Sequence, residues 1–132
     1  MHESNRMGRE RGFTFIEIIV VSLVLVILAA IAIPTFLGQR DRAFEAAVVA
    51  DLRNAGAARA YLVVAGNEPA TSTAELQAVG FTHSEGVSFT NDGDFTTHPS
   101  GLCIEGTHTN LDGRTWRFGS DGDANPREGS CG

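Results

Sequence analysis

Residues 13–37 read FTFIEIIVVSLVLVILAAIAIPTFL, and this stretch decides the architecture of the chain. It is apolar except at Thr14, Glu17, Ser22, Pro34 and Thr35. As a helix it would measure about 37 Å, which is enough to cross the hydrocarbon core of a bilayer. The sequence therefore predicts one membrane-spanning helix near the N-terminus.

The charges on either side of this stretch predict its orientation. Three arginines precede it, namely Arg6, Arg9 and Arg11. The charges that follow it are mixed, because residues 40–42 read Arg-Asp-Arg. Positive charge stays on the cytoplasmic side, so we expect residues 1–12 in the cytoplasm and residues 38–132 outside. The predicted protein is a single-pass protein of the cytoplasmic membrane.

Glu17 is the only ionisable residue within the predicted span. A carboxylate in an apolar helix is costly at the centre of a bilayer and less costly near its surface. In one interpretation, Glu17 lies close enough to the cytoplasmic interface to stay hydrated. In the other, an assembly brings a cation to it.

Composition excludes several classes of function. The chain has 132 residues and a net charge of -6, and all ten of its basic residues are arginines. General nucleic-acid binding is therefore not expected, and lysine-dependent catalysis is excluded. The two cysteines, Cys103 and Cys131, lie in the part predicted to be extracytoplasmic, where two thiols are expected to form one disulfide.

The run RGFTFIE at residues 11–17 resembles the N-terminus of type IV prepilins and the related pseudopilins. These families have a leader that ends in glycine, a first mature residue that is usually phenylalanine, a glutamate four residues later and a proline deeper in the span. Gly12, Phe13, Glu17 and Pro34 match these features in register. The resemblance covers roughly residues 11–47.

The resemblance implies how the chain is processed. A prepilin peptidase would cleave between Gly12 and Phe13 and N-methylate Phe13. The domains would be a leader (1–12), a transmembrane and filament-core helix (13–37) and an extracellular pilin-like domain (38–132). Translation from Met7 instead of Met1 would give a leader of a length more usual for the family.

The resemblance also implies a structural function without a cofactor. The chain would be a subunit of a type IV pilus or pilus-like filament, embedded in membrane lipid before assembly and extracellular afterwards. Its partners would be identical or related pilin subunits and an inner-membrane assembly platform. The amine of Phe13 would pair with Glu17 of a neighbour, and the helix near Pro34 would loosen during packing.

The helix is expected to continue beyond the span. Apolar residues recur at intervals of three, four or seven, namely Phe44, Val48, Leu52, Ala55 and Leu62. Asp51 and Glu45 fall outside this stripe. Gly66, with Pro69 three residues further, predicts the end of a helix over residues 13–65 that is about 80 Å long.

The C-terminal half is predicted to form a small antiparallel sheet. A capping-box spacing at Ser72 and Glu75 predicts a short helix that ends at Gly80. The expected hairpins are 87–90 with 95–97 and 102–105 with 115–118. The fold class is therefore α+β and pilin-like, with the outer half of the long helix on the sheet and a disulfide-closed C-terminal loop.

Other sites and functions are less well supported. Asp121, Asp123 and Asn125 alternate as in a calcium loop, but the spacing does not fit an EF-hand, so a solvated turn is the favoured interpretation. The four histidines lack metal-ligand spacing and are interpreted as surface residues, and we find no active site. One alternative is a secreted binding module released by signal peptidase after Ala32. The other is a membrane enzyme with an external domain.

Overall fold

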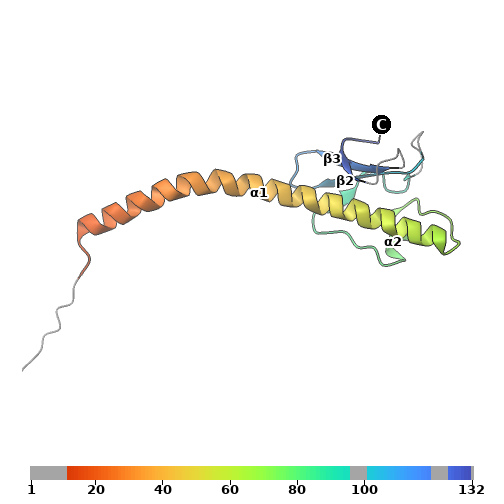
Figure 1. The fold of residues 1–132 in the computed structure, drawn as a ribbon, viewed down its shortest axis with the longest axis horizontal. Coiled ribbons are helices and arrows are strands. Elements are labelled where there is room, and N and C mark those ends of the chain that lie inside the picture. The colour runs from red at the N-terminus through yellow and green to blue at the C-terminus, as the bar shows by residue number, and fades with distance from the viewer. Residues whose placement is uncertain (1–11, 96–100, 120–124, 132) are drawn as a thin grey trace, which may run out of the picture. The chain divides into compact units, whose positions relative to one another are not determined.

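The computed structural model describes residues 12–95, 101–119 and 125–131. The elements are α1 (Phe15–Val64), α2 (Thr73–Gln77), β1 (Val87–Phe89), β2 (Cys103–His108), β3 (Thr115–Gly119) and β4 (Arg127–Glu128) (Figure 1). The predicted α+β class is confirmed, with a long N-terminal helix, a small antiparallel sheet and a disulfide between Cys103 and Cys131. The chain divides into two units, Met1–Leu37 and Gly38–Gly132.

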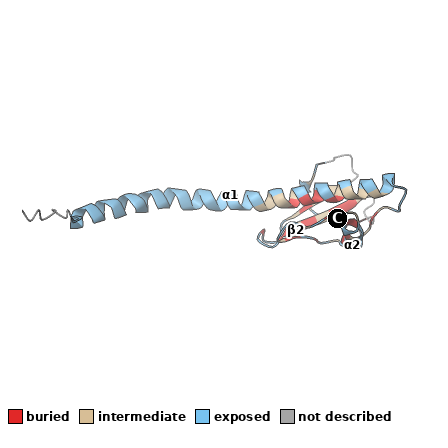
Figure 2. Cartoon of the chain, turned by 90° about the horizontal axis from the view of Figure 1, so that it is seen from below, coloured by how far each residue is buried: buried red, intermediate tan, exposed pale blue. Residues whose placement is uncertain are grey.

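The described part of the first unit is helical from Phe15 and stays helical through Pro34. Its apolar side chains are exposed along the whole segment, as the colouring of Figure 2 shows. Among the described residues, α1 is the one helix long and apolar enough to cross a membrane. The first unit therefore makes no hydrophobic core of its own.

The second unit is built around the outer part of α1. Val48, Leu52 and Ala55, spaced at four and three residues, are fully buried. They pack against apolar side chains from α2, the sheet and the connecting loops, among them Leu76, Phe81, Phe89, Phe95, Ile104 and Trp116. Phe44 and Leu62, at the two ends of the predicted stripe, are partly buried. The predicted apolar stripe is thus the face of α1 that packs on the rest of the second unit.

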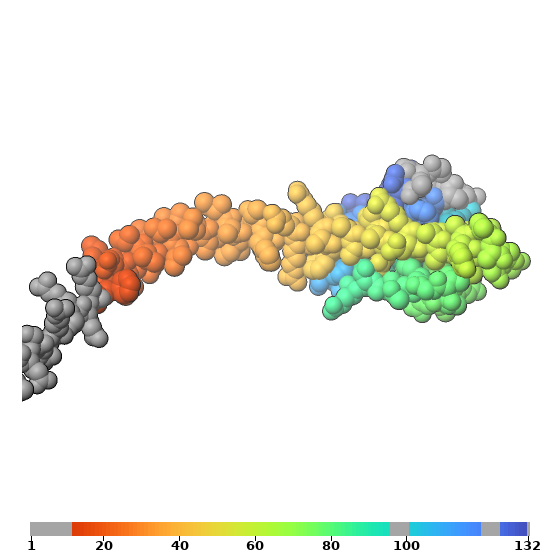
Figure 3. Space-filling view, turned by 60° about the horizontal axis from the view of Figure 1, so that its bottom comes forward, coloured from red at the N-terminus to blue at the C-terminus, as the bar shows by residue number. Residues whose placement is uncertain are grey.

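The four strands form an antiparallel sheet in the order β1-β2-β3-β4. Gly106 lies in β2 opposite Trp116 of β3. A Cβ at Gly106 would lie 3.4 Å from both Val48 and Leu52. Glycine at this position therefore lets α1 pack closely on the sheet. In Figure 3 the segment containing α2 follows one side of the outer part of α1.

One of the two predicted hairpins is wrong. β1 pairs with β2, with Ser88 opposite Thr107, and among the described residues it has no pairing with the segment that follows it. Phe95, which was expected in that partner strand, is fully buried, and its carbonyl accepts a hydrogen bond from the N–H of Cys103. Residues 96 and 97 lie outside the described residues. Phe95 thus belongs to the core and bonds to the first residue of β2, where the sequence had indicated a partner strand for β1.

The second predicted hairpin is confirmed, because β2 pairs with β3 across the turn at Asp112 and Gly113. Both turn residues have positive φ, 36° and 75°. The helix ends also agree with the sequence. Gly66 ends α1 with φ 81°, and the Glu75 carboxylate accepts hydrogen bonds from the first N–H groups around α2.

Asp51 was predicted to lie outside the apolar stripe, and this is wrong. Its side chain is buried, and its two carboxylate oxygens accept hydrogen bonds of 2.7 Å from the N–H and the hydroxyl of Ser84. His83 Nδ1 lies 3.7 Å from the same carboxylate. A charged side chain is tolerated here because the loop before β1 supplies its donors.

Candidate assembly site at the N-terminus

The helix α1 begins with a reciprocal capping box formed by Thr14 and Glu17. Oε2 of Glu17 accepts hydrogen bonds from Thr14 N–H at 2.8 Å and from the Thr14 hydroxyl at 2.9 Å. In return, the N–H of Glu17 donates to the Thr14 hydroxyl oxygen at 3.3 Å. The carboxylate therefore satisfies a donor that the start of a helix would otherwise leave free.

Sequence reasoning missed this second role of Glu17. The signal was present, since Thr14 and Glu17 have the spacing of a capping box immediately before an apolar run. Only Oε2 takes part in the bonds that the described residues make with this carboxylate. Its other oxygen, Oε1, is open to a cation from outside the chain.

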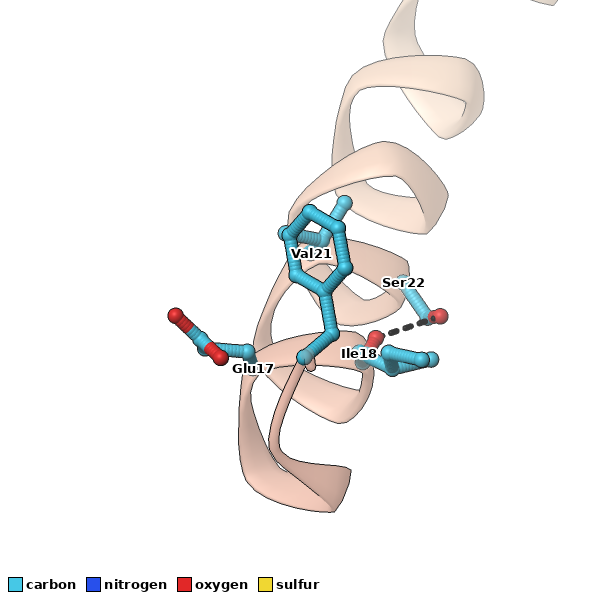
Figure 4. A pocket seen from close by; sticks show the side chains of 5 residues that line it. Glu17, Ile18, Val21 and Ser22 are labelled. Atoms are coloured by element: carbon cyan, nitrogen blue, oxygen red, sulfur yellow. Dashed lines mark hydrogen bonds between the residues drawn. The ribbon is translucent and has the colours of Figure 1, made fainter. Parts of the chain in front are cut away.

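The surroundings of the carboxylate are apolar. Phe13, Ile18 and Val21 line a shallow pocket together with Glu17 and Ser22. In Figure 4 the Glu17 side chain points away from Ser22 and out from the helix. The structure thus brings Phe13 and Glu17 to one surface, whereas Pro34 lies more than four helical turns further along α1.

The hydroxyl groups of the apolar segment are satisfied within the helix. Ser22 donates to the carbonyl of Ile18 at 2.7 Å, and Thr35 donates to the carbonyl of Ile31 at 3.1 Å (Figure 4 shows the first bond). Neither residue needs a polar partner from a neighbouring molecule. Glu17 is the one charged side chain of this segment among the described residues.

The C-terminal end of the second unit is held by side chains as well as by the predicted disulfide, which is present between Cys103 and Cys131. Oε2 of Glu105 accepts a hydrogen bond from the N–H of Cys131 at 2.8 Å. The amide of Asn91 donates to the carbonyl of Cys103 at 2.8 Å and accepts from the N–H of Glu105 at 2.8 Å. The disulfide thus lies within a small polar network.

The possible calcium loop is only partly visible. Asp121 and Asp123 lie outside the described residues. The amide oxygen of Asn125 accepts a hydrogen bond from the guanidinium of Arg53 at 3.2 Å. Within the described ranges, no group of three acidic, histidine or cysteine side chains is arranged to hold a metal ion. The calcium loop stays a prediction.

The interpretation of all four histidines as surface residues is wrong for His108. Its ring is buried and stacks on Phe44 with the ring centroids 4.2 Å apart. His108 Nδ1 accepts a hydrogen bond from the N–H of Asn110, so the neutral ring carries its proton on Nε2. His83 is partly buried, and His2 and His98 lie outside the described residues.

Comparison with known families supports the resemblance seen in the sequence. The family model of the prokaryotic N-terminal methylation motif matches residues 7–33. This match contains Gly12, Phe13 and Glu17, three of the four residues on which the resemblance was based, and ends one residue before Pro34.

Several curated proteins match the N-terminal part of the chain. The type II secretion system core protein G of Klebsiella pneumoniae is 44% identical over 46 residues, which cover 35% of this chain and 33% of that protein. The core protein G of Vibrio cholerae is 36% identical over 47 residues, which cover 36% of this chain and 32% of that protein. The chain therefore spans about a third of the length of these secretion-system relatives.

The match to a pilus protein is longer. The type IV wide pilus major component PilA4 of Thermus thermophilus is 34% identical over 74 residues, which cover 56% of each chain. The resemblance to type IV pilins and pseudopilins, inferred from residues 11–17 and Pro34, is thus confirmed for the N-terminal part of the chain.

Proposed function

We propose that the chain is a structural subunit of a type IV pilus or pilus-like filament. It would be inserted into the membrane as a prepilin, cleaved after Gly12, methylated at Phe13 and then polymerised. The observation that carries this proposal is the match of residues 7–33 to the methylation motif, with Gly12, Phe13 and Glu17 in register. The role is structural, and no catalytic residue is assigned.

The surroundings of Gly12 support its role in processing. A Cβ at this position would have no heavy atom within 4 Å, so packing in the described residues does not require glycine. A peptidase that must bind an extended, narrow segment gives a separate reason for glycine. Recognition of the cleavage site accounts for a glycine that the fold does not need.

The apolar helix and Glu17 together support assembly. The exposed apolar face of α1 up to Leu37 suits membrane lipid before assembly and neighbouring helices afterwards. After cleavage, the amine of Phe13 would carry a positive charge. Oε1 of Glu17 can form an ion pair with this ammonium group of a neighbouring subunit, because only Oε2 is used in the capping box. An ion pair in an apolar bundle needs both partners.

The partners follow from this scheme. A prepilin peptidase would process the leader, an inner-membrane assembly platform would add subunits, and identical or related pilin subunits would form the filament. Residues 1–12 would face the cytoplasm, and residues 38–132 would face outward and become extracellular in the filament. Pro34 lacks the N–H that would bond to the carbonyl of Ala30, which gives the helix a place to loosen.

A second candidate function is a pseudopilin of a type II secretion system. The 44% identity to a core protein G favours it, whereas the longer match to a pilus component favours a pilin. Deletion of the gene distinguishes the two candidates. Loss of surface filaments with normal protein secretion indicates a pilin, and a secretion defect indicates a pseudopilin.

The decisive experiment is intact-mass spectrometry of subunits sheared from the cell surface. We expect a chain that begins at Phe13 and carries one N-methyl group. In a Gly12→Val variant, only the uncleaved precursor should be found in the membrane. A mature chain that begins at Ile33 would establish the secreted module released after Ala32 instead.

A further inference from the structure

A groove of about 600 Å³ lies in the unit Gly38–Gly132, at the end where α1 enters it. We call this the proximal end and the end near Val64 the distal end. Phe44 and Ala47 give the groove an apolar wall, and Arg40 and Glu85 give it one positive and one negative charge. The groove thus combines an apolar wall with one side chain of each charge.

The two charges of the groove are available to a partner. Arg40 lies over the ring of Phe44, with its guanidinium carbon 5.3 Å from the ring centroid. Within the described part of the chain, neither Arg40 nor Glu85 forms an ion pair. His108, which stacks on Phe44, also lines the groove.

The distal end carries the same two kinds of charge. Glu68 is exposed and has no polar contact within the described ranges, whereas Glu75 and Asp92 accept hydrogen bonds from backbone N–H groups. Arg59 is partly buried, and its Nε donates to the carbonyl of Ala70 at 3.1 Å. Burial lowers the pKa of Arg59, and no carboxylate of the described residues forms an ion pair with its guanidinium.

An apolar side chain lies between these charges in the sequence. Val64, the last residue of α1, is 89% exposed. The unit itself therefore leaves this side chain uncovered. The distal end thus presents Glu68 and Arg59, neither of them in an ion pair within the described residues, together with an exposed apolar side chain.

We propose that the distal end of one subunit docks into the proximal groove of a second copy in the filament. Glu68 would face Arg40, Arg59 would face Glu85, and Val64 would contact the wall formed by Phe44. This inference rests on the proposed filament function. Subunits that all point the same way make head-to-tail contacts, so the distal end of one faces the proximal end of another.

The charge pattern favours a second copy over other occupants. A groove of one sign would suit any oppositely charged partner, but this groove carries one charge of each sign, and the tip offers Glu68 and Arg59, which form no ion pair within the described residues. Glu68 with Arg40 and Arg59 with Glu85 would make two opposite pairs when the two ends meet. The same chain supplies both complementary surfaces.

Charge reversal tests the contact. Glu68→Arg and Arg40→Glu should each lower the yield of sheared filaments about tenfold or more, because like charges then face each other. The double variant should recover to within about threefold of wild type. Arg42→Glu is the matched control, because Arg42 is exposed, makes the same charge change and does not line the groove.

A cysteine pair tests the contact independently of the charges. About 36 Å of helix separates Arg40 from Val64, so cysteines at positions 40 and 68 cannot form a disulfide within one chain. Filaments of a chain carrying Arg40→Cys and Glu68→Cys should therefore give a ladder of cross-linked oligomers under oxidising conditions. If a charge-reversal variant does not accumulate in the membrane, the presence or absence of this ladder tests the proposed contact by itself.

The outcomes separate this contact from the filament function. Filaments of wild type with no ladder, or normal yields from both single reversals, overturn the docking proposal and leave the filament function intact. Absence of any filament of the wild-type chain overturns the filament function itself. Recovery by the double reversal together with a ladder supports both.

Discussion

The two units of the chain treat apolar side chains in opposite ways. In the described part of the first unit every residue is exposed, and Phe15, for example, is 81% exposed. In the second unit, Leu52, Phe95 and Ile104 are fully buried. The first unit therefore needs lipid or other subunits to cover its surface, whereas the second covers itself.

Charged side chains follow the same division. Glu17 has hydrogen bonds from Thr14 but no cation within the described residues. Asp51 and Arg114 of the second unit have their partners within the same unit. Substitutions in the first unit should therefore change assembly, and substitutions of the internally paired side chains of the second unit should change stability. The predictions below test this division, beginning with the largest effect.

Glu17→Ala should abolish filaments while leaving the processed subunit in the membrane. The variant removes a charge that is unfavourable in an isolated span, so insertion should not suffer. The ammonium of Phe13 would then enter the filament core without a partner. The association constant should fall by about two to four orders of magnitude at each subunit addition. Filament counts, at equal membrane levels of the mature subunit, measure this loss.

Thr14→Val is the matched control for the capping role. It removes the hydroxyl that bonds to the Glu17 carboxylate but keeps the carboxylate itself. We expect filaments from this variant at a modestly reduced yield. Equal losses from Thr14→Val and Glu17→Ala would show that helix capping, and not ion pairing, is what Glu17 contributes. Normal filaments from Glu17→Ala alone would overturn the pairing scheme.

Removal of the disulfide should have the largest effect in the second unit. The bond between Cys103 and Cys131 joins residues 28 positions apart, and its loss should lower stability by about 3.5 kcal/mol. Fluorescence of Trp116, the only tryptophan and a buried residue, reports unfolding of this unit. Cys131→Ser should therefore lower the Tm measured by Trp116. Alkylation of the unreduced protein should label neither cysteine, and two labelled thiols would contradict the bond.

Asp51→Ala should have a smaller effect on the second unit. It leaves the N–H and the hydroxyl of Ser84 without their acceptor, at a cost of about 1 to 3 kcal/mol. Ser84→Ala, which removes only the hydroxyl, should destabilise less. Trp116 fluorescence during chemical unfolding measures both variants. Equal stabilities of Asp51→Ala and wild type would mean that the buried carboxylate does not hold the loop.

In the first unit, the long helix and the family resemblance could be predicted from sequence. We expect its features to be set by the surroundings: the span of 25 residues by lipid, the glycine before Phe13 by a peptidase and the isolated glutamate by a neighbouring subunit. Such constraints are local and can be read residue by residue. The capping role of Glu17 is equally local, since it follows from the spacing to Thr14.

The second unit depends on contacts that sequence spacing does not fix. The helix stripe and the β2–β3 hairpin were predictable, because their partners lie a few residues apart. Pairing of β1 with β2 was not, because the two strands are separated by residues 90–102 and the turn signal after β1 favoured a nearer partner. Burial of Asp51 likewise depends on Ser84, which is 33 residues away.

The smallest predicted effect concerns Arg114, which joins three elements of the second unit. Its guanidinium bonds to Glu128 of β4 at 2.8 Å, contacts Glu45 of α1 and lies over the ring of Trp116. The side chain is partly exposed, so solvent weakens these pairs, and Arg114→Met should lower the Tm by only a few degrees.

The pH dependence of this effect follows from Glu128. Its hydrogen bond to Arg114 lowers the pKa of Glu128, so the contribution to stability is present above the pKa of the unfolded chain and is lost as the pH falls through the lower folded pKa. The pKa of Glu75 is also lowered, because its carboxylate accepts a hydrogen bond from the N–H of Thr71. This contribution to the pH dependence is the same in the variant and in wild type, so it cancels in their Tm difference. The Tm difference between Arg114→Met and wild type should therefore be largest near neutral pH and shrink below about pH 4. A difference that stays constant down to pH 2 would assign the effect to packing of Arg114 on Trp116 instead of to its carboxylate partners.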